Sequence, residues 1–306
     1  MIERAVIIRD KTRLEQLIER FNSKAQAKFY IERSGGNFDF YEKEHNRFYE
    51  ELQSLTDGLD GIIKTKVVFR AFLMSYIFSD SEVVLAIGQD GLVANTAKYL
   101  SGQYLAGINP DPDSYDGVLL PFTSKTIVST IKNLFRGTVD SKTVRLAKAV
   151  LSDGQELLAF NDFFIGTNSH VSSRYKISFK GASEIHSSSG IIVSTSAGST
   201  GWLSSMLNMA HNLAAHFGIP MSSSTDDLNQ RKEDLIFTVR EPFASVTSQT
   251  NIGFGIIEPQ ECLTIESRMA GNGVIFSDGI EKDFLSFNAG TTVRISIATQ
   301  EVNLLI

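Results

Sequence analysis

The most constraining feature of the sequence is an unbroken apolar run, Val83–Ile87, that leads into the turn Gly88-Gln89-Asp90-Gly91. A strand without polar alternation is typical of a parallel sheet covered by helices on both faces. The glycines predict a tight turn after the strand, and the residues from Leu92 onward predict a helix. This stretch therefore predicts a doubly wound, Rossmann-like α/β layer.

The segments before this run fit the same layer. Short β-rich runs predict strands, and apolar residues at helical spacing predict amphipathic helices between them. We expect the α/β domain to span residues 1–143. The predicted strands are residues 4–9, 28–33, 65–70 and 82–87, and the predicted helices are residues 11–24 and 38–55.

Past Val144 the pattern changes to short β-rich runs separated by turns. This spacing predicts a mostly β, sandwich-like domain over residues 144–284. One helical pattern interrupts it, at residues 200–217, and carries an apolar face. The polar stretch 221–233 predicts a surface loop, and residues 285–306 are expected to return and complete the first domain.

Composition narrows the class of protein. The 306 residues are 42% hydrophobic and 21% charged, which excludes a disordered or membrane-embedded chain. The net charge of -6 argues against a nucleic-acid or anionic-membrane surface, although it leaves room for a local basic pocket. The single cysteine, Cys262, excludes an internal disulfide, and no apolar stretch reaches about 18 residues. We therefore expect a cytoplasmic protein.

The turn Gly88–Gly91 is the first candidate site. Free N–H groups at a helix N-terminus bind phosphate oxygens, and glycine lets the backbone approach a ligand. An acid at this place, Asp90, suits either a base acting on a nucleophilic hydroxyl or an Mg²⁺ ligand. A tight turn in which Asp90 merely caps the helix explains the same residues equally well.

Three further segments carry polar groups beside predicted strands. Ser196–Gly201 combines hydroxyls with two glycines, which favours a loop for sugar or phosphate oxygens over a simple helix cap. Asn161 and Asp162 lie between apolar runs and suit either a nucleoside contact or a polar turn. Asp278-Gly279 alone predicts a hairpin turn. The five histidines form no metal-ligand pattern, so we expect no protein-held metal set.

Taken in order, these segments resemble the NAD kinase family, within the superfamily that includes diacylglycerol and sphingosine kinases. Its members carry Gly-Gly-Asp-Gly, an Asn-Glu pair, Thr-Pro-Thr-Gly-Ser-Thr-Ala-Tyr and a late Asp-Gly. The matching segments here are Gly88–Gly91, Asn161-Asp162, Thr195–Trp202 and Asp278-Gly279, and Gly107-Ile108-Asn109 resembles the family's Gly-Ile-Asn.

The resemblance implies phosphorylation of the 2′-hydroxyl of the adenosine ribose of NAD by ATP or polyphosphate, giving NADP. It implies Mg²⁺ bound with ATP, and a homodimer or homotetramer. Asp90 is then the catalytic base, and the glycines of its turn bind phosphate. The implied phosphate-binding residues are Gly88 and Gly91, and the implied substrate-binding residues are Asn161, Asp162, Ser189, Ser199, Thr200, Gly201, Trp202 and Ser205.

The chain departs from the family pattern at five places, two of which are Leu92 in place of a threonine and Trp202 in place of a tyrosine. Gln89 replaces a glycine of the turn, Asp162 is one methylene shorter than the usual Glu, and Ser189 stands where Asp is usual. The Ser189-Gly190 form resembles the divergent mitochondrial-type branch. Two alternatives follow from these departures: a kinase of the same fold for another hydroxyl, in a sugar, nucleoside or lipid, and a dinucleotide-binding protein without catalysis.

Overall fold

The computed structural model describes residues 2–114, 116–219 and 233–306. The chain divides into two compact units, which we describe separately: unit 1 is Met1–Thr143 with Val302–Ile306, and unit 2 is Val144–Glu301. The segment that rejoins unit 1 is shorter than the expected 285–306, because most of the last strand pairs inside unit 2. The predicted polar loop, 221–233, lies outside the described residues apart from its last one.

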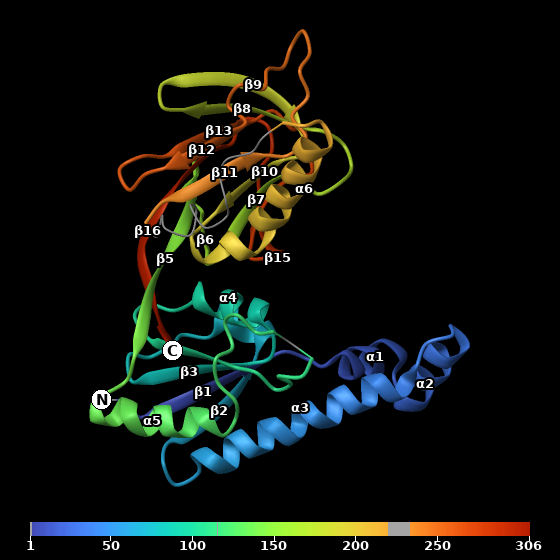
Figure 1. The fold of residues 1–306 in the computed structure, drawn as a ribbon, viewed down its shortest axis with the longest axis vertical. Helices are drawn as coiled ribbons and strands as arrows, with labels where there is room; N and C mark the ends of the chain where they lie inside the picture. Colours follow the sequence, from blue (N-terminus) through green and yellow to red (C-terminus); the bar gives the residue numbers. More distant parts are fainter. Residues whose placement is uncertain (1, 115, 220–232) are drawn as a thin grey trace. The chain divides into compact units, whose positions relative to one another are not determined.

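Unit 1 contains a parallel sheet in the order β2-β1-β3-β4, joined at its edge by the end of β16. Helices α3 and α5 cover one face of this sheet and α4 the other (Figure 1). All six residues of β3 are buried, as the unbroken apolar run requires, which confirms the doubly wound layer. The strands are β1 (Arg4–Arg9), β2 (Lys64–Phe69), β3 (Glu82–Ile87), β4 (Tyr104–Ile108) and β16 (Thr292–Leu305).

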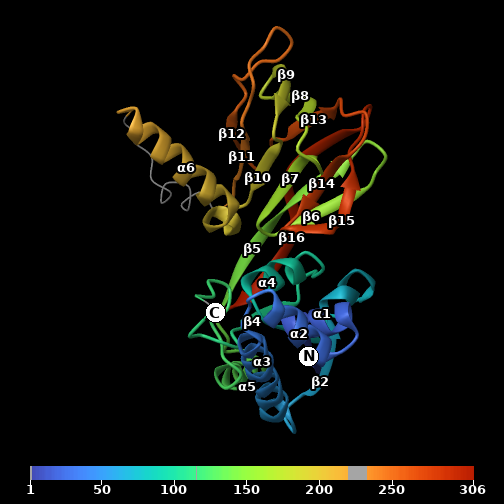
Figure 2. The same cartoon turned by 90° about the vertical axis from the view of Figure 1, so that its right-hand side faces the viewer.

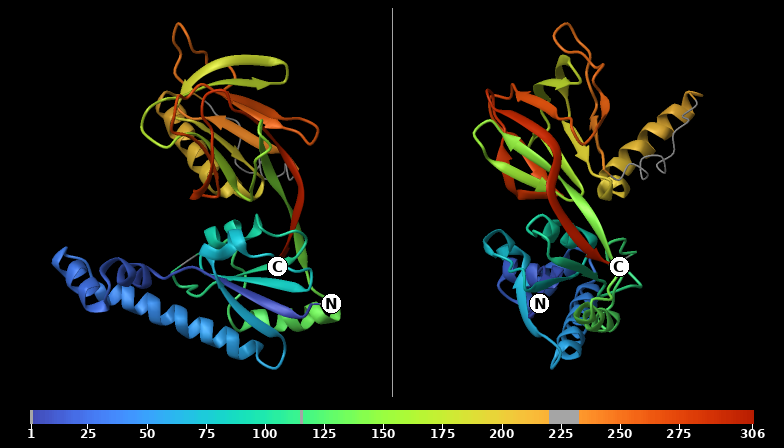
Figure 3. Two further views of the ribbon diagram at one scale, coloured as in Figure 1. Left: turned by 180° about the vertical axis from the view of Figure 1, so that it is seen from behind. Right: turned by 90° about the vertical axis from the view of Figure 1, so that its left-hand side faces the viewer.

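The helices of unit 1 correct one prediction. The expected strand at 28–33 is wrong, because these residues belong to helix α2. Ser23 caps this helix by accepting the N–H of Gln26, and Ala27 and Ile31, four residues apart, form its buried face. Figure 3 shows α1 and α2 packed on the N-terminal end of α3, beyond the sheet. The helices are α1 (Arg13–Phe21), α2 (Lys24–Arg33), α3 (Phe38–Leu59), η1 (Arg70–Ser75), α4 (Asp90–Ala97) and α5 (Thr126–Arg136).

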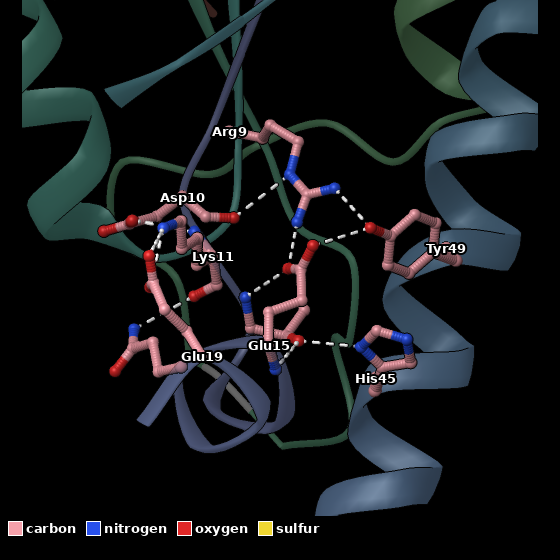
Figure 4. Close-up of polar contacts among 9 residues, drawn as sticks. Arg9, Asp10, Lys11, Glu15, Glu19, His45 and Tyr49 are labelled. Carbon is pink, nitrogen blue, oxygen red and sulfur yellow. Dashed lines mark hydrogen bonds and ion pairs between the residues drawn. The ribbon is translucent and has the colours of Figure 1, made fainter. Parts of the chain in front are cut away.

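A buried guanidinium ties this helical extension to the sheet (Figure 4). Arg9, the last residue of β1, forms an ion pair with Glu15 of α1 and donates to the Tyr49 hydroxyl of α3 at 2.9 Å. The guanidinium also lies within 4.9 Å of the ring centroids of Phe48, Tyr49 and Phe69. Burial alone raises the pKa of Glu15, but its hydrogen bonds with Tyr49 and Thr12 and the charge of Arg9 together lower it.

Unit 2 is a sandwich of two sheets, which confirms the second predicted domain type. Strands β13, β8 and β9, with β16, β5 and β6, form one sheet, and β12-β11-β10-β7-β14-β15 form the other. Tyr175, Phe163 and Phe237 fill the core between them. The strands are β5 (Ser141–Leu151), β6 (Glu156–Ala159), β7 (Asp162–Thr167), β8 (Ser173–Phe179), β9 (Ala182–Ser188), β10 (Ile191–Ser194), β11 (Leu235–Val239), β12 (Phe254–Ile257), β13 (Leu263–Ser267), β14 (Gly273–Ser277) and β15 (Ile280–Ser286).

Helix α6 (Trp202–His216) follows the short helix η2 (Ala197–Thr200) and packs by its first turns only. Trp202 and Met206 contact Phe164 on the outer face of the second sheet. Further along, the helix extends away from that sheet (Figure 2), and Met209 and Leu213 are about half exposed. The apolar face predicted for this helix is therefore only partly used in packing. Among the described residues, no helix is long and apolar enough to cross a membrane.

Replacing Arg9 tests the link between sheet and helices. Arg9→Ala removes a guanidinium that is 4% exposed and leaves Glu15 without its ion pair, so we expect the free energy of unfolding to fall by about 3 kcal/mol or more. Urea unfolding followed by far-ultraviolet circular dichroism measures this, since the single tryptophan lies in unit 2. Lys28→Ala, which breaks an exposed pair with Glu32, is the control. A similar small effect from both variants would contradict the expectation.

Candidate functional site

The glycine-rich turn lies where β3 ends and α4 begins. Gly88 donates its N–H to the carbonyl of Ile108 at 3.1 Å, which joins the turn to the end of β4. Gln89 and Gly91 are exposed, and a Cβ built on Gly91 meets no atom within 4 Å. No side chain caps α4. The backbone of this turn is therefore open to a ligand at the carboxyl edge of the parallel sheet.

Asp90 does not cap its own helix. Its Oδ1 accepts the N–H of Leu119 at 2.9 Å, and its Oδ2 accepts the N–H of Val118 at 3.1 Å. The carboxylate thus holds a loop that lies 28 and 29 residues further along the chain. A carboxylate oxygen has two lone pairs, so each oxygen keeps one site for another donor.

The same loop explains the Gly107-Ile108-Asn109 segment. A Cβ at Gly107 would lie 1.9 Å from the carbonyl oxygen of Leu119, so only glycine lets the loop approach β4 this closely. The Asn109 side chain accepts the N–H of Asp111 at 2.9 Å. The segment thus shapes the backbone beside the Asp90 turn.

A cavity of about 290 Å³ opens beside the turn, and all its walls belong to unit 1. Arg70 lies in it, held by Asp10 at 2.8 Å and by the Asn95 amide oxygen at 3.2 Å. Three other cations line it, each paired with an acid, but guanidinium and ammonium groups have several N–H donors and can bind a further anion. The lining includes Lys11, Arg13, Arg47, Arg70, Asp10, Glu44, Asp111, Gly88, Gln89 and Gly91.

Sequence reasoning missed these cations. A signal was present for Lys11 and Arg13, because they follow β1, and the carboxyl ends of neighbouring parallel strands meet at one edge. No local signal marks Arg47, whose place on α3 reaches the cavity only through packing. It pairs with Asp111 at 2.8 Å.

In unit 2, Asp278 brings two predicted motifs together. It lies in the turn between β14 and β15, and its carboxylate accepts the N–H groups of Phe160 at 3.1 Å and Asn161 at 2.6 Å. Its own N–H donates to the carbonyl of Asp162 at 3.0 Å. The late Asp-Gly is thus a hairpin turn, as predicted, and also the acceptor that holds the Asn161-Asp162 pair.

The hydroxyl-rich loop lies against the same pair. The Thr195 hydroxyl donates to the carbonyl of Phe160 at 2.5 Å, and the Thr195 N–H donates to that of Asn161 at 2.9 Å. A Cβ on Gly198 would lie 2.1 Å from the Asn161 carbonyl oxygen, so this approach requires glycine. No side chain caps α6 itself, whereas the Thr195 hydroxyl accepts the N–H of Gly198 at 3.2 Å at the start of η2, so one hydroxyl of this loop does act as a cap.

The predicted substrate-binding residues fall into two groups in unit 2. A Cβ on Gly201 would lie 3.9 Å from Oδ2 of Asp162, and the ring of Trp202 stacks on Phe164 with centroids 5.8 Å apart. Ser189 lies apart, in the turn between β9 and β10, whereas the residue paired with Asp162 is Ser194 at the far end of β10. Among the residues near Asp162, Ser199 is buried. Thr200, Gly201 and Ser205 are exposed.

Asp162 is the most perturbed acid of the site. Its residue is 7% exposed, and no hydrogen bond to its carboxylate is present among the described residues. Burial raises the pKa of Asp162 to about 7, and the negative charge of Asp278 adds to the effect. A buried acid that titrates near neutrality in a polar loop cluster is a candidate functional group.

The described residues contain no group of three or more His, Cys, Asp or Glu side chains that could hold a metal ion. Mg²⁺ that arrives with a nucleotide needs only one or two carboxylates besides phosphate oxygens and water. Asp10 and Asp111 line the unit 1 cavity and fit that smaller requirement.

Solved structures share this fold. The structure of yeast NADH kinase complexed with NADH matches with a TM-score of 0.61 at 12% identity, covering 100% of this chain and 84% of that chain. An NAD kinase from Archaeoglobus fulgidus in complex with ATP matches with a TM-score of 0.56 at 13% identity, covering 99% and 93%. No protein-family model and no curated protein matches the chain. The chain therefore has the NAD kinase fold.

The titration of Asp162 predicts a pH dependence of stability. Between pH values of about 4 and 7 the unfolded chain releases this proton while the folded chain keeps it, so stability falls as pH rises. Asp162→Asn removes the effect, and its stability relative to wild type should increase by roughly 2 kcal/mol from pH 5 to pH 8. Urea unfolding at both pH values measures this. Glu281→Gln, an exposed acid of the same unit, is the control, and equal pH dependence in both variants would refute the assignment.

Proposed function

We propose that the chain is a kinase that transfers a phosphoryl group from ATP to the 2′-hydroxyl of the adenosine ribose of NAD, producing NADP. The observation that carries the proposal is the open glycine turn beside a cavity lined by four cations. Solved structures of the same fold, an NADH kinase with NADH and an NAD kinase with ATP, support it.

The donor would bind in unit 1. Backbone N–H groups at the start of α4 suit phosphate oxygens, and Gly88 and Gly91 leave room for them. Lys11, Arg13, Arg47 and Arg70 neutralise charge that phosphates bring. Mg²⁺ bound with the nucleotide would neutralise part of the same charge. Inorganic polyphosphate offers the same oxygens, so it is the second donor to be assayed.

The acceptor would bind in unit 2. The Asn161 amide and the Asp162 carboxylate suit the polar edge of adenosine, because both accept hydrogen bonds and the amide also donates. The rest of the pocket would be lined by Ser199, Thr200, Gly201, Trp202 and Ser205, and Ser189 would contribute from the turn between β9 and β10.

The reaction needs one proton acceptor. As the 2′-oxygen attacks the terminal phosphorus, the bond between that phosphorus and the bridging oxygen of ADP breaks, and the hydroxyl proton leaves. We assign this proton to Asp90, whose two oxygens each keep a free lone pair. Its bonds to Val118 and Leu119 fix the carboxylate, so no reorganisation is needed during the reaction.

The decisive experiment measures NADP formation from NAD, ATP and Mg²⁺ by the purified chain. Asp90→Asn should lower kcat by about 10²-fold or more, because the amide cannot accept the proton. Asp116→Asn, an exposed acid close to the same loop, should leave kcat unchanged. No NADP from wild type with either donor, or equal rates in wild type and Asp90→Asn, would overturn the proposal.

A substitution at Gly91 tests binding of the phosphate donor without disturbing the fold. Gly91→Ala adds a methyl group where the protein itself leaves open space, so we expect thermal stability to be kept. If phosphate approaches this backbone, the KM for ATP should rise at least about tenfold while the KM for NAD stays constant. Gly271→Ala, also in open space, is the matched control. An unchanged KM for ATP would remove Gly91 from the phosphate site.

One observation favours a second candidate, a dinucleotide-binding protein without transfer. Both oxygens of Asp90 already accept backbone N–H groups, an arrangement that also fits a purely structural role. Calorimetry that detects NAD binding, together with an absence of turnover from either donor, would select this candidate.

A further inference from the structure

Asp278 forms hydrogen bonds to three consecutive residues, 160–162, through its carboxylate and its backbone N–H. The two carboxylate oxygens accept the N–H groups of Phe160 and Asn161, with a longer contact of 3.4 Å to the N–H of Asp162. Its backbone N–H donates to the Asp162 carbonyl at 3.0 Å. The N–H groups of residues 160–162 therefore share one acceptor side chain, from a hairpin 116 or more residues away, while Thr195 holds the carbonyls of Phe160 and Asn161.

We infer that Asp278 is a positioning residue for the acceptor substrate, which holds Asn161 and Asp162 in place and strengthens Asp162 as a hydrogen-bond acceptor for a substrate hydroxyl. The inference rests on the proposed function, because it deepens the role of the acceptor pocket. The carboxylate oxygens of Asp278 accept backbone N–H groups, whereas the Asp162 carboxylate has no hydrogen bond among the described residues.

The negative charge of Asp278 has an effect separate from that of its hydrogen bonds. A neutral acceptor would hold the loop as well, so the negative charge of Asp278 adds something else: it acts on Asp162. A buried carboxylate beside a like charge gains more from a donated hydroxyl proton than a solvated one does. Asp278 thus makes the Asp162 carboxyl harder to ionise and, once it is ionised, a stronger acceptor for a substrate hydroxyl.

The other neighbours of Asp162 do not compete for this role. Ser194 faces it across the β10–β7 ladder, and Gly201 approaches it with no side chain. The guanidinium of Arg240 lies over the rings of Phe164 and Trp202, and the causes of the pKa shift of Asp162 are burial and Asp278. Burial is therefore the main cause of the raised pKa of Asp162, and Asp278 is the charged group that raises it further.

Two substitutions distinguish the hydrogen bonds of Asp278, which hold the loop, from the effect of its negative charge. Asp278 has φ 54°, a left-handed conformation that Asn and Gly tolerate best, so both variants keep the turn. Asp278→Asn removes the charge and keeps one acceptor oxygen. Asp278→Gly removes every side-chain acceptor. Glu281→Gln, which removes an exposed charge on the same hairpin, is the matched control.

Steady-state kinetics test the positioning role. Asp278→Gly should raise the KM for NAD at least about tenfold and leave the KM for ATP within about twofold. In wild type the KM for NAD should fall as pH rises from 6 to 8, because the ionised Asp162 accepts the hydroxyl proton. In Asp278→Asn this dependence should move to lower pH. A folded Asp278→Gly variant with an unchanged KM for NAD would overturn the inference.

Carbon NMR of aspartate-labelled full-length protein supplies a readout that needs no turnover. The Asp162 carboxyl signal is assigned by its loss in Asp162→Asn, and its titration midpoint should fall by about one pH unit or more in Asp278→Asn. The midpoint should not move in Glu281→Gln. An equal midpoint in wild type and Asp278→Asn would overturn the inference, whereas absence of NADP with a shifted midpoint would overturn only the proposed function.

Discussion

Backbone N–H groups in loops need acceptors, and in each unit an aspartate supplies them. In unit 1 Asp90 holds Val118 and Leu119, and in unit 2 Asp278 holds Phe160 and Asn161. Both aspartates lie in turns that directly follow buried strands. The loops that carry the candidate site residues therefore depend on rigid sheets for their conformation, which is what a preorganised site requires.

Glycine makes the same loops possible. Gly107 and Gly198 each face a backbone carbonyl so closely that no Cβ would fit. At Gly91, by contrast, nothing in the protein excludes a side chain. This difference separates glycines that the fold needs from one whose open space suits a ligand. Gln89 shows that the turn accepts a side chain, which is exposed beside the cavity.

The sequence predicted the elements whose signals are local. The run Val83–Ile87 predicted a strand covered on both faces, and the turn after it was expected at the carboxyl edge of the sheet, as the structure shows. The predicted strand at residues 28–33 was wrong because β-forming aromatic residues lie on the exposed face of helix α2, while Ala27 and Ile31 form its buried face. The place of Arg47 in the cavity could not be predicted from the sequence, because this residue comes near the glycine turn only when α3 packs against the sheet.

The two aspartates Asp90 and Asp162 differ in their surroundings. In unit 1 the two oxygens of Asp90 accept the N–H groups of Val118 and Leu119, which fixes the orientation of this carboxylate. Asp162 is the less usual residue, shorter than the family's Glu, yet burial and Asp278 raise its pKa to about 7. Asp90 is thus a carboxylate oriented by its own loop, whereas Asp162 is a buried carboxyl whose charged form a donated hydrogen bond would stabilise.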